Sequence, residues 1–329
     1  MSAIEVQAPG LFTTVQDLGR EGFGPIGVSA SGAADPTALR LGNRVTGNPE
    51  SAAALEMTLL GGTYRFREAC VLALTGSDFG ATLGATSDAS ESTSTPVPLW
   101  TSVQAKAGQS IRLGSTRSGA RCYLCVRGGI VVSEFLGSAS THVLSGLGGV
   151  EGRALRKGDV LEVGNGSGGT FEERRVSPQL LRRLAPRKVL RVTTGPQMDW
   201  FEPATRKLFF ATTYRVSEEA NRMGIRLTAA PGQGAGPAGC GRQMITEGVS
   251  LGAIQLPDSG SPIVLFVEQQ TTGGYPKIAN VISADLPSLG QLRPRDEIRF
   301  ELVEWEQARA LLAEREDLLR SEELIEKGG

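Results

Sequence analysis

The sequence predicts an all-β protein made of two related domains. Glycine is frequent, at 43 of 329 residues, and the apolar runs are short and separated by glycine, proline, serine and aspartate. Short apolar runs between turn residues are typical of the strands of sandwiches and barrels. The third observation is an internal repeat, because three segments of the first half resemble three segments of the second half in the same order.

The repeat also predicts the domain boundaries. We expect a first domain over residues 1–170, a linker over 171–187, a second domain over 188–303 and a C-terminal helix or tail over 304–329. The linker is predicted from its charged, proline-containing sequence. The matching segments are residues 4–17 with 190–201, residues 118–129 with 259–270, and residues 157–163 with 294–300.

Helical periodicity is convincing in only three segments. Residues 36–47, 177–187 and 304–327 repeat apolar side chains every three or four positions. The last of these alternates charged residues with leucine and alanine. We therefore predict a surface or docking helix at the C-terminus.

Composition and charge exclude several classes of function. The formal net charge is −1 and the pI is about 6.1, without the basic patch that a nucleic-acid-binding protein needs. The sequence has no run of eighteen apolar residues and no signal-peptide pattern at its start. We expect a cytoplasmic protein that binds a small molecule and protein partners, and neither nucleic acid nor membrane.

Motifs for metals and common cofactors are absent. Cys122 and Cys125 lie three apart on a predicted strand and would point to opposite faces, so they are expected to pack in the core. With His142 as the single histidine, no metal site is predicted. None of the six lysines lies in a phosphate-binding P-loop or beside a methionine, which argues against covalent biotin.

Two clusters of polar residues are candidates for binding a ligand. Ser29, Ser31 and Asp35 lie just before the helix that begins at Pro36, where amides and hydroxyls suit an anion, although Asp35 also suits a helix cap. Asn221, Arg222 and Arg226 form the second cluster. Its arginines fit either surface salt bridges or bidentate binding of a carboxylate.

The stretch VEQQTTGGYP, residues 267–276, is the third cluster. An apolar strand ends there in two hydroxyls, two glycines and a tyrosine. Gly273 and Gly274 weaken a strand unless the chain turns or a ligand approaches the backbone closely. The stretch is therefore either an ordinary turn or a strand end that faces a substrate.

A dozen collinear motifs resemble one protein family. They include APGLFTTVQDLGR, GVSASGAADPTALRLGNRVTGN, YLCVRGGI, LGSAST, NRMGIRL, EGVSLGAIQLP and QTTGGYPKIANVISADLPSLGQLRPRD. Between about residues 5 and 303 the chain is similar to the biotin-dependent carboxyltransferase and allophanate-hydrolase subunit 2 family, which includes KipI antagonists and the C subunit of 5-oxoprolinase. The resemblance implies two tandem cyclophilin-like β-barrel domains.

The resemblance also implies a function and partners. A free-standing chain of this length is similar to the C subunit of the bacterial ATP-dependent 5-oxoprolinase, which acts with a KipI-like B subunit and a third lactam-utilisation subunit. That complex uses ATP to open 5-oxo-L-proline to L-glutamate. The resemblance therefore implies that the isolated chain is inactive. The alternatives are a carboxyltransferase component of a urea or allophanate pathway that depends on biotin, and a non-catalytic antagonist of a KipI-like kinase inhibitor.

The same resemblance selects candidate site residues. Glu268 and Gln269 stand where the family usually has Asp-Arg, and Ala220 stands where Ser is usual, so roles that depend on those residues do not transfer. A carboxylate could serve as base for water, while hydroxyls and glycine amides could stabilise an oxyanion. The predicted catalytic residues are Glu247, Glu268, Thr271 and Thr272, and the predicted substrate-binding residues are Ser29, Ser31, Asp35, Asn221, Arg222, Arg226, Gln270, Gly273, Gly274 and Tyr275.

Overall fold

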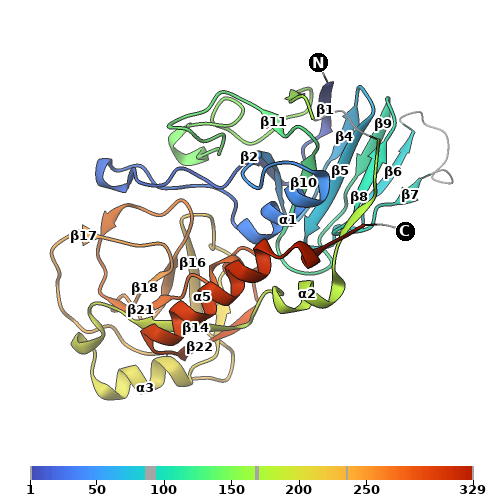
Figure 1. Cartoon of the computed structure of the whole chain (residues 1–329). Coiled ribbons are helices and arrows are strands. Elements are labelled where there is room, and N and C mark those ends of the chain that lie inside the picture. The colour runs from blue at the N-terminus through green and yellow to red at the C-terminus, as the bar shows by residue number, and fades with distance from the viewer. Residues whose placement is uncertain (1, 86–93, 167–169, 235, 328–329) are drawn as a thin grey trace. The chain divides into compact units, whose positions relative to one another are not determined.

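The computed structural model describes residues 2–85, 94–166, 170–234 and 236–327, which form a mostly β protein with few helices (Figure 1). The predicted all-β class is confirmed. The chain divides into two compact units. The first unit comprises Met1–Arg20, Ser31–Leu184 and Leu319–Gly329, and the second comprises Glu21–Ala30 and Ala185–Leu318.

The first unit is a sandwich of two antiparallel sheets. Apolar side chains from both sheets, among them Val6, Tyr64, Leu72 and Leu124, pack into one core. The larger sheet has the order β11-β12-β1-β4-β9-β6-β7 and the smaller one β2-β3-β10-β5-β8. The strands are β1 (Ser2–Ala8), β2 (Phe12–Gln16), β3 (Ala54–Thr58), β4 (Thr63–Phe66), β5 (Cys70–Gly76), β6 (Thr82–Ala85), β7 (Thr95–Pro96), β8 (Ser102–Ala105), β9 (Gln109–Arg112), β10 (Arg121–Val126), β11 (Ile130–Val131) and β12 (Val160–Val163).

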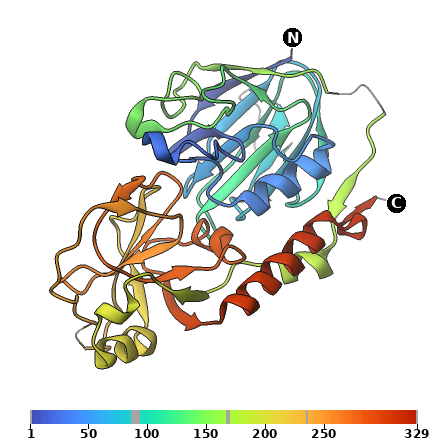
Figure 2. The same ribbon diagram turned by 60° about the vertical axis from the view of Figure 1, so that its left-hand side comes forward.

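Helix α1 (Pro36–Thr46) covers the other face of the smaller sheet, against β5 and β10 (Figure 2). Strand β10 is therefore buried on both faces, which explains its continuous apolar run. Cys122 packs in the core between the sheets and Cys125 packs under the helix, so the two thiols are free, buried and on opposite faces, as predicted. Gly42 allows this contact, since a Cβ there would lie 2.5 Å from the Cys125 sulfur.

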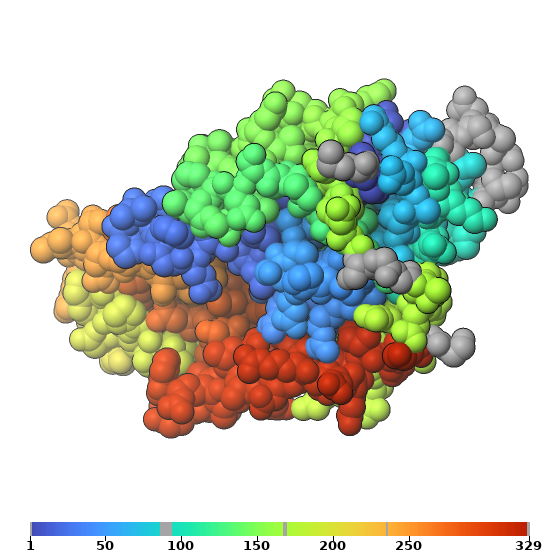
Figure 3. Space-filling view, turned by 45° about the horizontal axis from the view of Figure 1, so that its top comes forward, coloured from blue at the N-terminus to red at the C-terminus, as the bar shows by residue number. Residues whose placement is uncertain are grey.

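Residues near the C-terminus return to the first unit. Helix α5 (Trp305–Arg320) presents mostly exposed side chains, as predicted for a surface helix, and is seen in red in Figure 3. The helix ends at Arg320, earlier than the periodicity suggested. A 3₁₀ turn, η5 (Glu322–Leu324), follows it, and β23 (Ile325–Lys327) then pairs antiparallel with β13 (Arg174–Val176) in the predicted linker.

The second unit is a closed barrel. Its strand order is β14-β21-β18-β19-β16-β15-β22, and Phe209 stacks on Phe300 with ring centroids 5.1 Å apart. The ring pair belongs to a buried aromatic cluster that also contains Tyr214. The strands are β14 (Val189–Thr194), β15 (Tyr214–Val216), β16 (Gly224–Ala229), β18 (Ala253–Gln255), β19 (Ile263–Leu265), β21 (Lys277–Val281) and β22 (Glu297–Leu302).

Short elements complete the fold. Helix α3 (Pro203–Ala211) was not predicted, because Phe209 is its one buried side chain among the described residues and a single position shows no periodicity. None of the helices in the described ranges has the length and apolar run needed to cross a membrane. The remaining elements are α2 (Pro178–Arg183), α3 (Pro203–Ala211), α4 (Leu286–Leu289), η1 (Gly24–Ile26), η3 (Val143–Ser145), η4 (Met198–Trp200), β17 (Glu247–Gly248) and β20 (Thr272–Gly273).

The internal repeat does not extend to strand pairing. The repeat matches β1 with β14 and β12 with β22. In the first unit β1 and β12 are antiparallel, whereas in the second unit β14 and β22 are parallel. Similar strand sequences therefore serve different pairings, because side-chain alternation does not specify strand direction.

Candidate functional site

The candidate site is built around a two-stranded ribbon beside the barrel. Strand β17 pairs antiparallel with β20, which places Glu247 opposite Gly273 and Gly248 opposite Thr272. The ribbon therefore joins the predicted stretch at residues 270–275 to Glu247, which is more than twenty positions earlier in the sequence. The predicted catalytic residues Glu247, Thr271 and Thr272 are brought together by this pairing.

The stretch from Gln270 to Tyr275 separates two cavities. One cavity of about 410 Å³ is lined by Gln270, Gly274 and Tyr275, and we call it the Arg226 cavity. The other, of about 530 Å³, is lined by Thr271 and Thr272, and we call it the Lys277 cavity. Different residues of the same stretch therefore line the two cavities.

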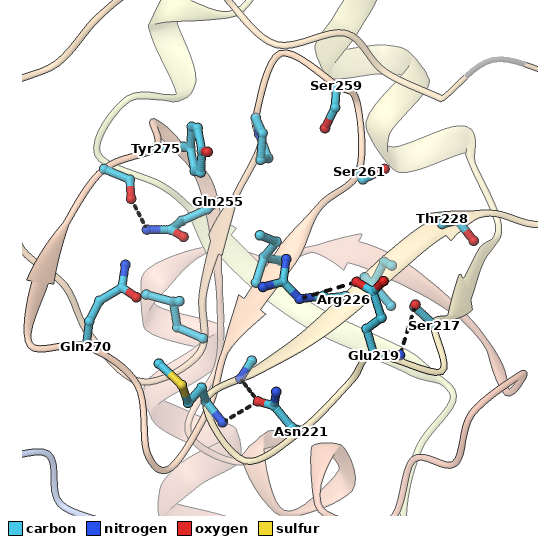
Figure 4. A pocket seen from close by; sticks show the side chains of 17 residues that line it. Ser217, Glu219, Asn221, Arg226, Thr228, Gln255, Ser259, Ser261, Gln270 and Tyr275 are labelled. Atoms are coloured by element: carbon cyan, nitrogen blue, oxygen red, sulfur yellow. Dashed lines mark hydrogen bonds and ion pairs between the residues drawn. The ribbon is translucent and has the colours of Figure 1, made fainter. Parts of the chain in front are cut away.

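The Arg226 cavity is polar (Figure 4). Arg226 is half-exposed there, with its Nε 3.9 Å from Glu219 Oε2. Gln255 donates a hydrogen bond to the Gly274 carbonyl at 2.9 Å, which fixes the backbone beside Tyr275. Asn221 Oδ1 accepts from the Met223 amide at 2.8 Å and so shapes the turn before β16. The predicted residues Asn221, Arg226, Gln270, Gly274 and Tyr275 all line this cavity.

The Lys277 cavity contains a buried lysine that the sequence pattern did not reveal. The Lys277 side chain is 3% exposed, and its Nζ lies 2.5 Å from Glu247 Oε1. Gln197 holds both partners, because its Oε1 accepts from the Lys277 amide at 3.0 Å and its Nε2 donates to Glu247 Oε1 at 2.8 Å. Lys277 and Glu247 thus form an ion pair that Gln197 holds in place through hydrogen bonds to both residues.

The Lys277 ammonium changes the chemistry available to Glu247. Hydrogen bonds from Lys277 and Gln197 lower the pKa of Glu247 below its ordinary value of 4.5. A carboxylate with a lowered pKa stays ionised at neutral pH but is a weaker base. Glu247 is therefore better suited to hold Lys277 and orient water than to keep an abstracted proton.

The Glu247 pair predicts a pH-dependent stability. Because the folded-state pKa is lowered, the pair stabilises the fold above pH 4.5 and this contribution disappears as the pH falls through the folded-state pKa. The contribution should be about 1 kcal/mol or less, since the carboxylate is half-exposed. We expect the difference in urea midpoint between the native chain and Glu247→Gln to shrink between pH 5 and pH 3. A difference that does not vary with pH would contradict this prediction.

The predicted residues Arg222 and Glu268 form a separate, buried pair. Arg222 Nε lies 2.5 Å from Glu268 Oε1, and both side chains are 6% exposed. The Glu268 amide also donates to the Arg222 carbonyl at 2.9 Å. Neither residue lines the two described cavities. This arrangement argues against the predicted roles of Glu268 as a catalytic base and Arg222 as a substrate ligand. The pair instead links the two loops that contain these residues.

The predicted cluster at residues 29–35 is divided between the units. Ser29 belongs to the segment Glu21–Ala30 of the second unit, whereas Ser31 and Asp35 belong to the first. Ser31 Oγ donates to the Thr141 carbonyl at 3.0 Å, and Asp35 Oδ1 accepts from the Ala38 amide at 3.1 Å. The structure thus gives Asp35 the helix-capping role that was the alternative to anion binding.

Sequence reasoning missed Lys277, Gln197 and Asn280, which lies at the same cavity as Lys277. A lysine at the start of the mostly apolar strand KIANV was a usable signal, because lysine is almost never buried without a partner. Asn280 could not be placed, because a β-bulge at Ile278 shifts the alternation of β21 by one residue. The bulge lets Lys277 and Asn280, three positions apart, face one cavity.

Comparison with known proteins identifies the family. Residues 26–302 match the family model described as "Carboxyltransferase domain, subdomain A and B". The chain is 37% identical over 305 residues to the C subunit of 5-oxoprolinase from Escherichia coli strain K12, covering 93% of both chains. It is 34% identical over 304 residues to the C subunit of 5-oxoprolinase from Haemophilus influenzae, covering 91% of this chain and 90% of that one.

A solved structure also resembles this chain over most of its length. The crystal structure of the K. lactis urea amidolyase superposes with a TM-score of 0.84 at 33% identity, covering 97% of this chain. The chain spans only 20% of that protein's length. The match of the family model over most of the chain, together with these near-full-length relatives, shows that this chain belongs to the carboxyltransferase domain family, subdomain A and B.

Proposed function

We propose that the chain is the C subunit of an ATP-dependent 5-oxoprolinase, which opens 5-oxo-L-proline to L-glutamate. The observation that carries the proposal is the 37% identity to a relative of that name over 93% of both chains. Urea amidolyase of Saccharomyces cerevisiae is 34% identical, but the chain spans only 18% of it. The higher identity, over nearly all of the 5-oxoprolinase relative, therefore favours the 5-oxoprolinase component.

The proposal includes partners and a division of labour. The relatives are named as subunits, which supports an assembly of several chains. We infer a KipI-like B subunit and a third lactam-utilisation subunit as partners, with ATP consumed by the complex and no activity in the isolated chain. None of the lysines lies in a P-loop sequence, so this chain is not assigned the phosphate-binding site.

The Lys277 cavity supplies groups that suit lactam opening. The lactam oxygen would attack the γ-phosphoryl group of ATP and release ADP, and water would then add to the activated carbon. Cleavage of the ring C–N bond, followed by hydrolysis of the acyl phosphate with a second water, gives glutamate and phosphate. Thr271 and Thr272 would donate to the negative oxygen, and Glu247 would orient water. Of the two predicted glycines, Gly274 lines the Arg226 cavity and Gly273 lines neither of the two described cavities.

A carboxyltransferase role is the second candidate. Relatives named urea amidolyase and putative urea carboxylase match 91–97% of this chain at 31–34% identity. Urea, like a lactam, offers a carbonyl oxygen beside an N–H group, so the same cavity would suit it. In that case biotin would be carried by another chain, because no lysine here has a neighbouring methionine.

The test is ATP-dependent release of glutamate from 5-oxo-L-proline by this chain mixed with its two inferred partners. We expect activity only in the full mixture. Thr271→Val should lower kcat about 10- to 100-fold, because a hydrogen bond to a charged oxygen is lost. Thr205→Val on α3, remote from the ribbon in sequence, is the matched control and should leave kcat unchanged.

The outcomes separate the candidates. A full mixture that assembles but releases no glutamate would overturn the 5-oxoprolinase proposal. ATP-dependent carboxylation of urea with a biotin-bearing partner would then support the carboxyltransferase. Assembly without either reaction would favour a regulatory antagonist of a KipI-like protein.

A further inference from the structure

We propose that Lys277 and Asn280 recognise the amide edge of a lactam, with Lys277 donating to the carbonyl oxygen and Asn280 Oδ1 accepting from the ring N–H. The inference rests on the proposed function and assigns the substrate contacts that it leaves open. Both residues lie on β21 and line the Lys277 cavity. Neither was selected from the sequence.

The first observation is the unused hydrogen-bonding capacity of Lys277. The residue is 2% exposed, and an ammonium group has three N–H donors. Its one polar contact among the described residues is Glu247 Oε1, at 2.5 Å. A buried donor without a partner is costly, so the remaining N–H groups favour an acceptor that enters the cavity.

The second observation is the unused acceptor of Asn280. Its Oδ1 atom is buried and has no hydrogen-bond partner among the described residues. The bulge at Ile278 lets Asn280 line the same cavity as Lys277. A cationic donor and a neutral acceptor therefore lie on one strand, and both lack a partner for part of their capacity.

The chemistry of the ligand follows from this pair. A ligand that satisfies both residues must carry a hydrogen-bond acceptor next to a donor. In a small lactam the ring holds the amide cis, so that the carbonyl oxygen and the N–H lie on the same edge. A carboxylate has acceptors only and would leave Asn280 Oδ1 without a donor. The arrangement therefore selects cis amides, including lactams and urea, over simple carboxylates.

The Glu247–Gln197 brace gives this arrangement its orientation. Gln197 holds both Glu247 and the Lys277 backbone, and Glu247 in turn pairs with the Lys277 ammonium group at 2.5 Å. Thr271 and Thr272 line the same cavity and supply further donors on the carbonyl side. Lys277 would thus polarise the lactam carbonyl while Asn280 sets the direction of the ring.

The experiment compares lactams with and without the N–H group on the full chain. Binding of 2-pyrrolidinone and N-methyl-2-pyrrolidinone is followed by NMR, through the backbone amide signals of Thr272 and Lys277. We expect 2-pyrrolidinone to bind at least 10-fold more tightly than the N-methyl compound. Equal binding by the native chain, or no shift of these signals at saturating lactam, would overturn the inference.

Two variants locate the recognition. Asn280→Leu should remove the preference for the N–H compound, because the acceptor is gone while the size of the side chain is retained. Lys277→Met should weaken both compounds about 10- to 100-fold, whereas Lys207→Met, at an exposed lysine of the same unit, should change neither. A preference that persists in Asn280→Leu would assign the N–H group to another residue and overturn the proposal.

The inference and the proposed function can fail separately. If urea binds with the same dependence on Lys277 and Asn280 but 5-oxo-L-proline does not, the inference stands and the substrate is wrong. If the complete complex with Asn280→Leu hydrolyses 5-oxo-L-proline at an unchanged KM, the function stands and the inference is wrong.

Discussion

Replacing Glu268 by alanine should lower the free energy of unfolding of the second unit by about 3–5 kcal/mol. The Glu268 carboxylate lies 2.5 Å from Arg222 Nε, and each side chain is 6% exposed. Removing the carboxylate takes away an anion that is paired with a buried guanidinium. That loss is large, because the Arg222 guanidinium remains desolvated while its attraction to the Glu268 carboxylate is lost.

A surface pair in the same unit gives the matched control. Arg295 and Glu218 also form an ion pair, at 2.7 Å, but their side chains are 75% and 63% exposed. Glu218→Ala should cost less than about 1 kcal/mol, because solvent screens the pair. The double change Arg222→Met with Glu268→Met should recover most of the loss, since a buried ion pair often contributes little over an apolar pair of similar size.

Urea denaturation followed by tryptophan fluorescence measures the effect. A Trp100→Phe background leaves Trp200 and Trp305, both in the second unit, as reporters. The same variants test the predicted base, because Glu268→Gln should retain kcat in the assembled complex once its folded fraction is accounted for. A large loss of kcat with unchanged stability would restore Glu268 as a catalytic residue.

Replacing Glu56 by alanine should destabilise the first unit by a similar amount, about 3–5 kcal/mol. Glu56 is 1% exposed on β3, and its Oε2 accepts from Tyr123 Oη at 2.6 Å and from the Ala34 amide at 2.8 Å. Its Oε1 lies 3.5 Å from Arg121 Nε. One carboxylate therefore compensates a buried cation and two donors.

The Glu56 network also positions the start of α1. Tyr123 Oη accepts from the Asp35 amide at 2.8 Å while it donates to Glu56. Burial raises the pKa of Tyr123, which therefore remains a neutral donor. Tyr123→Phe should cost about 1–3 kcal/mol, less than Glu56→Ala, because no charge loses its partner.

The measurement uses the tryptophan of the first unit. A background with Trp200→Phe and Trp305→Phe leaves Trp100 as the reporter. Glu5→Ala is the control, since Glu5 pairs with Arg65 at 4.0 Å and the two side chains are 35% and 44% exposed. Equal effects of Glu5→Ala and Glu56→Ala would contradict the importance of the buried network.

The sequence by itself determined the class of fold and the family to which the chain belongs. Short apolar runs between turn residues predicted the strands, and Asp35-Pro36 predicted the start of α1, because these signals are local. The opposite orientation of Cys122 and Cys125 also followed from strand periodicity alone. The sequence also predicts the QTTGGYP stretch as a candidate site, because glycines and hydroxyl side chains that follow an apolar run can be identified from the sequence alone.

Only the tertiary structure decided which candidates share a cavity. Glu247 and Thr272 meet through the ribbon, Glu268 is buried against Arg222, and Lys277 and Asn280 share a cavity because of one extra residue in β21. Pairing partners and bulges depend on contacts between distant parts of the chain, which local propensity does not encode. The sequence could therefore identify polar residues near strand ends, but burial and charge pairing decided which of them face a ligand and which stabilise the fold.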